Sequence, residues 1–359
     1  MQLLEYFYDR NNELENYHPR KFTIAETTHL LLYGSPASGK TSLALDYLNT
    51  FDEELTLYID FLDPKFTFYD IIEEDVESFI LDNEIEILVL DHYEMNYFEN
   101  LPKVKQVIIV SREYHDMGNY FESLKLPLLD YEEFFSFQQR GNETQLFNQF
   151  LRLGTFPALA THTLRKEQYF LSFLQSHFDD SELKLLNILA HFNTTSVTTH
   201  QLYTYAKERY KISKDLIYKQ INAFEKQGII YYVSDFQNKK QKKLIFFDFA
   251  LVKYLSFSQN FPRVFETMIA LSLIKHEVSF QFFGLHGYIT QQRHLIYPAP
   301  FETEERVWKK AHNLFSGYKK AKVTKVYIIT VNLRYEFKIE TILFEALPFY
   351  EWVVINDDL

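Results

Sequence analysis

The sequence predicts a multidomain α/β protein in which a mostly parallel sheet comes first, a three-helix segment with two strands follows, and a second α/β region ends the chain. A length of 359 residues exceeds what one ordinary hydrophobic core holds. Short apolar strands alternate with helical patterns between residues 29 and 129. Charge also divides the chain, because residues 1–160 carry a balance of −18 and residues 161–359 a balance of +6.

Composition excludes several classes of protein. Hydrophobic residues at 47% with 24% charged residues are typical of a globular chain and not of a disordered one. The absence of cysteine excludes disulfides, thiolate zinc sites and cysteine nucleophiles. No apolar stretch approaches the roughly 18 residues of a membrane span, and the acidic, polar start is unlike a signal peptide. We therefore expect a cytoplasmic protein without membrane contact.

The first domain, expected at residues 1–160, carries a phosphate-binding motif. The strand His29–Tyr33 runs into Gly34-Ser-Pro-Ala-Ser-Gly-Lys-Thr41, which matches G-x-x-x-x-G-K-[ST] without a mismatch, and Ser42–Leu48 then predicts a helix. Glycines let backbone N–H groups turn toward phosphates, and the helix N-terminus adds its positive dipole end. Lys40 is expected to reach the β- and γ-phosphates of ATP, and Thr41 to hold Mg²⁺. The residues expected to bind the nucleotide are Gly34, Ser35, Pro36, Ala37, Ser38, Gly39, Lys40, Thr41 and Ser42.

Four further segments predict the other strands of this sheet. The segment Glu86–Asp91 is apolar up to a final carboxylate, as expected of the acid that orients Mg²⁺. The other three are Leu55–Asp60, Gln106–Ser111 and Leu124–Leu129. Strands and helices that alternate in this way favour a doubly wound sheet with the nucleotide at the carboxyl ends of the strands.

The second domain, expected at residues 161–245, predicts three helices and a hairpin. The helices are Ser181–Phe192 with a serine N-cap, Thr199–Tyr210, and Ser213–Gln227 ended by Gly228; the strands are Ile229–Val233 and Leu244–Phe247. In the third helix, Ile217, Ile221 and Phe224 share one inward face.

A polar helix face beside a basic hairpin loop is what a DNA-binding winged helix presents to a major groove and to phosphates. An interaction with another protein, with the lysines merely solvated, is the alternative. The residues expected to contact DNA are Lys214, Lys219, Asn222, Lys226, Lys239, Lys240, Lys242 and Lys243.

Over nearly its whole length the chain resembles bacterial and archaeal AAA-like P-loop ATPases, in which a winged helix and a restriction-endonuclease-like domain follow the ATPase. The segments that carry the resemblance are Leu31–Thr41, Leu57–Pro64, Ile87–Asp91, Leu126–Phe137 and Leu153–Pro157. The resemblance implies ATP and Mg²⁺ as cofactors and an endonuclease-like fold for residues 246–359.

One departure from the family bears on catalysis by ATP hydrolysis. The family places a glutamate after the magnesium-orienting aspartate, whereas Asp91 is followed by His92-Tyr93-Glu94. Glu94 or His92 could take that role, and Ser111 stands where the family has a residue that senses the γ-phosphate. Weak hydrolysis is therefore expected. The candidates for an arginine finger are Arg112, Arg140 and Arg152.

The last domain is expected to be a degenerate nuclease. Glu266 fits the family's helix glutamate, but the strands Gly287–Gln292 and His294–Phe301, which should supply further acids, contain no carboxylate. Clustered carboxylates are needed to hold Mg²⁺ for phosphodiester hydrolysis. Glu336-Phe-Lys338 resembles a nuclease signature but comes one strand too late.

We therefore expect an ATP-binding switch, with ATP and double-stranded DNA as partners. The alternatives are an ATP-dependent endonuclease and a nucleotide-dependent protein-interaction module. A second copy of the chain or another protein remains open as a further partner.

Overall fold

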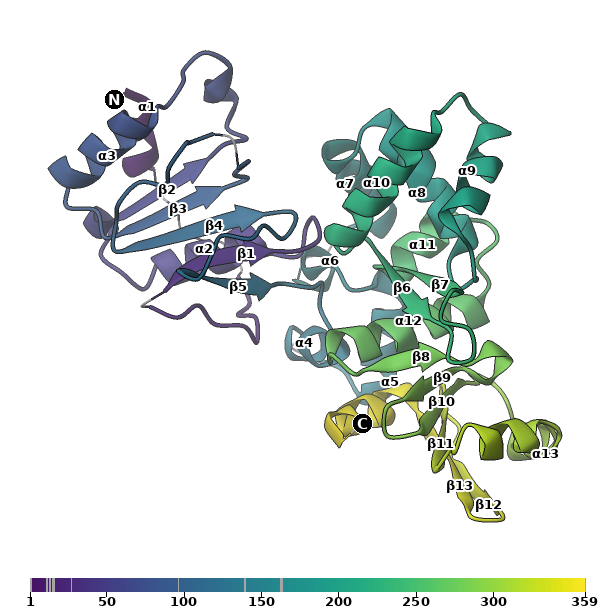
Figure 1. Cartoon of the computed structure of the whole chain (residues 1–359). Coiled ribbons are helices and arrows are strands. Elements are labelled where there is room, and N and C mark those ends of the chain that lie inside the picture. Colours follow the sequence, from purple (N-terminus) through teal and green to yellow (C-terminus); the bar gives the residue numbers. More distant parts are fainter. Residues whose placement is uncertain are drawn as a thin grey trace. The chain divides into compact units, whose positions relative to one another are not determined.

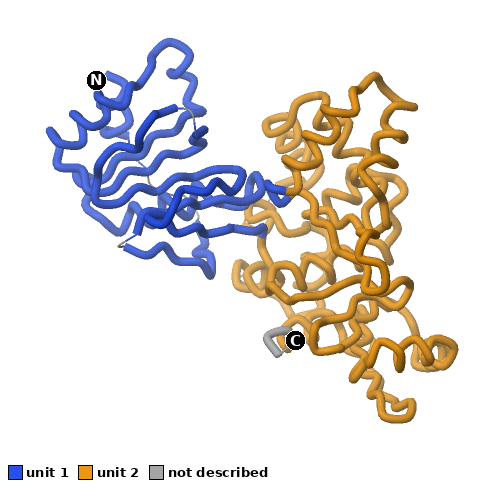
Figure 2. The backbone as a smooth tube through the Cα atoms, viewed as in Figure 1, with its two compact units in different colours: residues 1–128, 226–228 blue, residues 129–225, 229–359 orange. Residues whose placement is uncertain are grey.

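The computed structural model describes residues 2–358 apart from residues 11, 13, 15, 16, 27, 96, 139, 162 and 163. The chain forms two compact units, of which the first comprises residues 1–128 with 226–228 and the second residues 129–225 with 229–359 (Figure 2). The three-domain division expected from the sequence is finer than this one and stays a prediction.

The first unit contains a five-stranded sheet with the order β2-β3-β4-β1-β5, in which every neighbouring pair is parallel (Figure 1). This confirms the predicted parallel α/β sheet. The strands are β1 (His29–Tyr33), β2 (Thr56–Asp60), β3 (Ile87–Asp91), β4 (Gln106–Ser111) and β5 (Phe121–Lys125).

Helices cover both faces of this sheet. Because successive side chains of a strand point to opposite faces, Leu31 packs with α1 and α3 on one side, whereas Leu30 and Leu32 pack with α2 on the other. Both β3 and β4, which lie inside the sheet, are buried at every residue. The helices are α1 (Gln2–Tyr8), α2 (Lys40–Leu48) and α3 (Glu73–Asp82), with short 3₁₀ turns at Glu53–Leu55 and Pro64–Thr67.

The fifth strand lies earlier than predicted. It spans Phe121–Lys125 and not Leu124–Leu129, and most of its residues are exposed or half-buried. An edge strand of this kind lacks the apolar run that marks a central strand, so the pattern pointed instead to the buried leucines just beyond it. Leu126 continues past the strand and donates its N–H to the carbonyl oxygen of Tyr33 at 2.8 Å.

The second unit begins with a helical region that ends in a hairpin. Its helices are α4 (Tyr131–Ser136), α5 (Glu143–Leu153), α6 (Pro157–Thr161), α7 (Lys166–His177), α8 (Asp180–Phe192), α9 (Thr199–Lys207) and α10 (Lys214–Lys226). The hairpin consists of β6 (Ile230–Ser234) and β7 (Lys242–Phe246), which pair in an antiparallel register.

The three helices expected in this region are present, with small corrections at their ends. Helix α8 is capped by Asp179 and not by Ser181, because Asp179 and Glu182 form a reciprocal capping box. In α10, Ile217, Ile221 and Phe224 are buried as predicted. The segment between α8 and α9 contacts the hairpin through an isolated antiparallel bridge between Ser196 and Lys243. Beside this bridge, Thr194 donates its N–H to the carbonyl oxygen of Leu244, and Leu244 donates to that of Thr195.

A six-stranded mixed sheet completes the second unit, with the order β12-β13-β11-β10-β9-β8. Its strands are β8 (Phe280–Phe282), β9 (Tyr288–Thr290), β10 (His294–Pro298), β11 (Lys325–Thr330), β12 (Tyr335–Ile339) and β13 (Ile342–Pro348). The accompanying helices are α11 (Phe249–Leu255), α12 (Phe261–Lys275), α13 (Glu304–Lys320) and α14 (Phe349–Trp352), followed by a 3₁₀ turn at Val353–Asp358.

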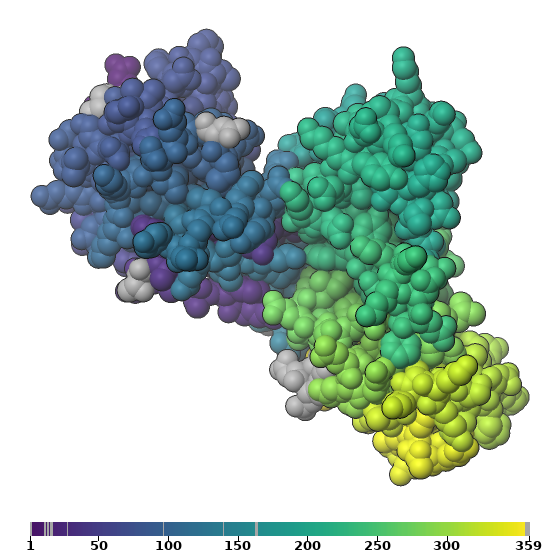
Figure 3. All heavy atoms as spheres, viewed as in Figure 1, coloured from purple at the N-terminus to yellow at the C-terminus, as the bar shows by residue number. Residues whose placement is uncertain are grey.

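Within the second unit, the three-helix segment and the last strands lie at opposite ends (Figure 3). The hairpin joins them, because Phe236 donates its N–H to the carbonyl oxygen of Phe282 on β8 at 2.8 Å. The buried carboxylate of Asp248 caps α11 and joins it to the segment between α5 and α6, because it accepts from the N–H and hydroxyl of Thr155 at 2.7 and 2.8 Å. In the part of the chain that is described, no helix is both long enough and apolar enough to cross a membrane.

Candidate functional site

The motif Gly34–Thr41 forms the loop between β1 and α2, as predicted. Gly34 and Gly39 have φ angles of 145° and 91°, which favour glycine. A Cβ atom on Gly34 would collide with the carbonyl oxygen of Leu126. Ala37 also has a positive φ, at 57°. The loop therefore turns tightly at positions where side chains other than small ones carry a steric cost.

Lys40 begins α2 and is buried. Its ammonium group donates to the carbonyl oxygens of Gly34 and Ser35, each at 2.9 Å. Burial lowers the pKa of Lys40 to about 8, an effect that the charge of Asp91 opposes and the charge of Arg112 reinforces. The ammonium group thus lies inside the curve of the loop, where oxygen acceptors surround it.

Thr41 and Asp91 meet beside this loop. The hydroxyl of Thr41 donates to Oδ2 of Asp91 at 2.7 Å, and the hydroxyl of Tyr58 donates to the same oxygen at 2.8 Å. Asp91 is fully buried at the carboxyl end of β3. A hydroxyl and a carboxylate in contact are hard oxygen ligands of the kind that Mg²⁺ takes beside waters and phosphates, so this pair fits a magnesium ion.

His92 lies between two carboxylates. Its Nδ1 is 2.8 Å from Oδ1 of Asp60 and 3.5 Å from Oδ1 of Asp91. Its backbone has a φ of 55°, and its N–H donates to Oδ1 of Asp91 at 2.8 Å. Burial alone lowers the pKa of His92, but the hydrogen bond to Asp60 and the two carboxylate charges outweigh burial and raise that pKa.

Glu94 is the other residue that the sequence offered in place of the missing glutamate. It lies exposed on the turn after His92, where its carbonyl oxygen accepts from the N–H of Tyr97 at 3.0 Å. Burial first, and then the charge of Glu94, raises the pKa of Tyr97. The carboxylate of Glu94 therefore acts on that phenol, whereas the structure brings His92, and not Glu94, into contact with Asp91.

Ser111 ends β4, the strand that lies between β1 and β3, and Arg112 follows it. Ser111 is buried and pairs in register with Tyr33, directly before the loop. The charge of Arg112 acts on both Lys40 and His92. Arg112 is thus an electrostatic neighbour of the site, whereas the other two arginine-finger candidates, Arg140 and Arg152, lie in the second unit.

Three residues of the site were not predicted. Tyr58 and Asp60 reach it from β2, and Arg20 supports the loop by donating to the carbonyl oxygens of Ser38 at 2.5 Å and Pro127 at 2.9 Å. Asp60 could have been predicted, because it is an acid at the end of a strand and the carboxyl ends of neighbouring parallel strands lie at the same edge of a sheet. Arg20 carries no such signal. Of the remaining loop residues, Ser35, Pro36 and Ser38 are buried, and Ser42 is half-buried in the first turn of α2.

The residues expected to contact DNA divide into two groups. Exposed side chains lie on α10 and on the hairpin loop, namely Lys214, Lys219, Asn222, Lys226, Lys239, Lys240 and Lys242. Lys243 is different, because it is buried and its Nζ lies 2.6 Å from Oε1 of Glu266. The hydroxyl of Tyr288 donates to the same carboxylate oxygen at 3.0 Å.

The contacts of Glu266 also bear on the nuclease site that the sequence suggested. Glu266 is bound to Lys243 and Tyr288, and β8, β9 and β10 contain no acidic residue. Glu336 and Lys338 are exposed on the edge strand β12, where Glu336 pairs in register with Glu345. Among the described residues, no group of three or more histidines and acids could hold a metal ion.

No family model and no curated protein matched the chain in searches of both. Among solved structures, a Walker-type ATPase of Pyrococcus abyssi is similar at 14% identity and a TM-score of 0.44, over 64% of this chain and 91% of that one. A signal transduction ATPase with numerous domains and a tetratricopeptide repeat sensor from Pyrococcus horikoshii is similar at 16% identity and a TM-score of 0.27, over 69% of this chain and 43% of that one. A Drosophila origin recognition complex bound to AT-rich DNA and Cdc6 is similar at 12% identity and a TM-score of 0.20, over 64% of this chain and 85% of that one.

Because all three TM-scores are below 0.5, we assign the fold class of the chain from its own structure and not from these similarities. The five parallel strands, the covering helices, and the loop between β1 and α2 fit the α/β fold of P-loop NTPases. Lys40, Thr41 and Asp91 then stand together at the carboxyl edge of this sheet.

Proposed function

We propose that the protein binds ATP with Mg²⁺ at the loop Gly34–Thr41 and acts as a nucleotide-controlled switch. The observation that carries this proposal is the convergence of Lys40, Thr41 and Asp91 at one edge of the sheet. The ammonium group of Lys40 would exchange the carbonyl oxygens of the loop for phosphate oxygens. Contact with a polyanion would favour the charged form of Lys40 and so oppose the burial that lowers its pKa.

The residues that would hold Mg²⁺ are Thr41 and Asp91, through a hydroxyl and a carboxylate oxygen. A bound magnesium ion would neutralise charge on the phosphates. Tyr58 would then keep Asp91 in place, since its hydroxyl already donates to Oδ2 of that carboxylate.

We further propose slow ATP hydrolysis in which His92, held by Asp60, takes the part of the residue that orients water. Its contact with both Asp60 and Asp91 supports this choice over the exposed Glu94. Ser111 would face the γ-phosphate from the end of β4. If turnover is measurable, His92→Ala should reduce it at least tenfold while Glu94→Gln leaves it within about twofold, on the usual scale of acid–base contributions.

The second part of the proposed function is DNA binding by a winged helix made of α8, α9, α10 and the hairpin β6–β7. The order of three helices and a hairpin supports this interpretation, as do the bridge between Ser196 and Lys243 and the exposed lysines of α10 and the hairpin. We propose that Lys239, Lys240 and Lys242 contact phosphates. Lys243 is excluded from that set because Glu266 neutralises it.

Nuclease activity is not part of the proposal. The pairing of Glu266 with Lys243 and Tyr288, and the absence of acids on β8, β9 and β10, support a degenerate endonuclease-like domain. The expected result is that plasmid DNA stays intact in Mg²⁺. Nicking that disappears in Glu266→Ala would contradict this.

Both parts of the proposal can be tested with purified full-length chain. For the nucleotide site, Asp91→Asn should retain ATP binding without Mg²⁺ but lose the increase in affinity that Mg²⁺ gives to the wild type. For the winged helix, a mobility-shift titration with double-stranded DNA should show that changing Lys239, Lys240 and Lys242 to alanine lowers the slope of log affinity against log salt by about 2 to 3.

A matched control removes the same charge elsewhere, by changing Lys309, Lys319 and Lys320 of α13 to alanine, and should keep the wild-type slope. Binding of DNA that is equal in both triple variants would rule out the hairpin as the contact. Absence of any shift at low salt would favour the alternative, a nucleotide-dependent module that binds another protein.

A further inference from the structure

An open pocket of about 520 Å³ lies in the second unit, along helix α5 and the loop before it. Its lining residues are Arg140, Gly141, Gln145, Asn148, Gln149 and Arg152. The spacing explains this polar surface, because residues three and four apart share a helix face. The opposite face of α5 is apolar and buried, with Leu146, Phe147 and Phe150 in the core.

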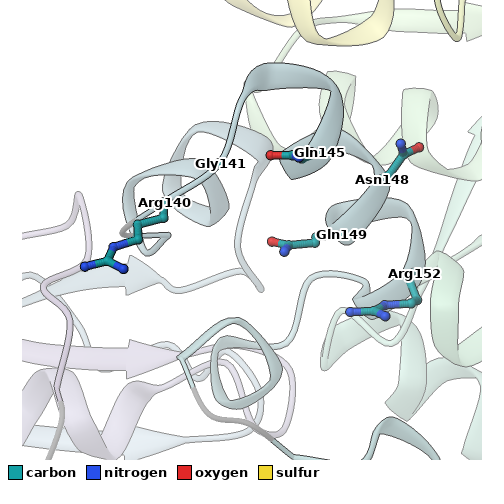
Figure 4. A pocket seen from close by; sticks show the side chains of 6 residues that line it. All are labelled: Arg140, Gly141, Gln145, Asn148, Gln149 and Arg152. Atoms are coloured by element: carbon teal, nitrogen blue, oxygen red, sulfur yellow. The ribbon is translucent and has the colours of Figure 1, made fainter.

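The polar ends of three side chains gather on one side of α5. Figure 4 shows Gln145, Gln149 and Arg152 pointing to the same side of the helix, whereas Asn148 points to the other side and Arg140, on the preceding loop, extends away from α5. The lining set contains two guanidinium groups and three carboxamides but no carboxylate. This is unusual for residues 1–160, where acidic side chains outnumber basic ones by 29 to 11. The pocket therefore concentrates positive charge within an acidic part of the chain.

The polar groups of this pocket are largely free to bind a ligand. Neither Arg140 nor Arg152 makes a hydrogen bond or an ion pair with a residue that the structure describes. Oε1 of Gln149 is buried and has no hydrogen-bond partner in the same part of the chain. Gln145 uses its Oε1 to accept from the N–H of Asn142, which leaves its Nε2 available as a donor. A buried acceptor without a donor is costly, so a ligand that donates to Gln149 gains binding energy there.

We propose that this pocket binds a small phosphate ester that also carries hydroxyl groups, such as a sugar phosphate or a nucleoside monophosphate. Arg152 supplies planar, bidentate donors for a phosphate dianion, and Arg140 adds positive charge at the rim. Gln149 accepts from a hydroxyl of the ligand, and Gln145 donates to one of its remaining oxygens. The volume exceeds that of inorganic phosphate and falls in the range of pockets for small organic ligands, roughly 300–1,000 Å³.

The site is separate from the proposed ATP site, since it contains no residue of the loop Gly34–Thr41. A test must therefore remove the contribution of that loop. We would use the full-length Lys40→Ala chain and titrate ribose 5-phosphate by calorimetry, with ribose and inorganic phosphate as the two component probes. Ribose 5-phosphate should bind, ribose should not, and inorganic phosphate should bind at least tenfold more weakly than the ester.

Variants then assign the binding to the pocket. In the Lys40→Ala chain, Arg152→Ala should weaken ribose 5-phosphate binding about tenfold or more, the scale of one hydrogen bond to a charged group. Arg140→Ala should have a smaller effect, because Arg140 stands on the loop at the rim. Gln149→Leu should bring the affinity for ribose 5-phosphate down to that for inorganic phosphate.

The matched control is Arg165→Ala, which removes an exposed arginine at the N-cap of α7 and should leave binding unchanged. The same titrations in the wild-type chain, with and without Arg152→Ala, replace the Lys40→Ala background if that variant does not fold. The proposal is overturned if ribose 5-phosphate does not bind, if Arg152→Ala binds it as well as the parent does, or if only a DNA oligonucleotide requires these arginines. Loss of ATP binding would not bear on it, because a different site carries that function.

Discussion

Changing Lys243 to methionine should destabilise the second unit, although the sequence placed this residue among the lysines of a DNA-binding loop. Its Nζ lies 2.6 Å from Oε1 of Glu266, and the two side chains are only 11% and 21% exposed. Its ammonium group also lies 5.2 Å from the ring centres of Phe282 and Tyr288. Methionine keeps the length of the side chain but leaves the Glu266 carboxylate without its cation.

The size of the effect follows from the burial of the pair. Removing one partner of a fully buried ion pair costs about 3–5 kcal/mol. Glu266 keeps the hydrogen bond from Tyr288 and some contact with water, so a loss of about 2 kcal/mol is expected. For a unit of this size, that corresponds to a fall in melting temperature of about 4–8 °C.

The assay is thermal unfolding followed by circular dichroism, with Lys240→Met as the control. Lys240 is exposed, so its replacement should change stability by less than about 0.5 kcal/mol. Adding Glu266→Gln to Lys243→Met should recover part of the loss, because no uncompensated charge then remains. A Lys243→Met chain that melts with the wild type, or a double variant whose loss is the sum of the single losses, would refute this reasoning.

Three further predictions concern other parts of the chain. Arg20→Ala should weaken ATP binding about tenfold in equilibrium titrations, because the buried guanidinium no longer ties the loop carbonyl of Ser38 to the carbonyl of Pro127; unchanged affinity would contradict this role. Gly154→Ala should lower the unfolding free energy by at least about 2 kcal/mol, since φ is 82° and the new Cβ would lie 2.5 Å from a buried carboxylate oxygen. Gly118→Ala, at φ 76° with open space around it, should cost only about 1–2 kcal/mol, and equal losses in urea unfolding would argue against the steric account. Burial lowers the pKa values of His286 and His294, so the unfolded chain binds more protons than the folded one and stability should fall as pH drops below 6.5. Changing both histidines to glutamine should make the melting temperature less dependent on pH between pH 7 and 5, and an unaltered pH profile would exclude them as the cause.

The nucleotide site could be predicted from sequence where local patterns define it. The loop Gly34–Thr41 combines a fixed spacing of glycines, lysine and threonine with a strand before it and a helix after it, and Asp91 ends an apolar strand. What sequence could not give was the order of strands. Because β2 lies beside β3, Asp60 reaches His92, and that contact depends on a pairing which neither segment encodes alone.

The hairpin shows a second limit. Lys242 and Lys243 are neighbours on β7, so their side chains point to opposite faces, and only one of them could face water. This alternation was available in the sequence. The partner of the buried lysine was not, because Glu266 lies on α12 and meets β7 only through tertiary packing. The edge strand β5 was misplaced for the related reason that exposure removes the apolar pattern.

Calorimetric titration of ATP into the wild-type chain and into Lys40→Ala, both with Mg²⁺, tests the proposed nucleotide site most directly. We expect the wild type to bind one ATP per chain and Lys40→Ala to lose at least a hundredfold in affinity for ATP. The control Lys103→Ala, which changes an exposed lysine of the same unit, should bind ATP as the wild type does. Wild-type affinity in the Lys40→Ala chain, or no ATP binding by the wild type, would contradict the account.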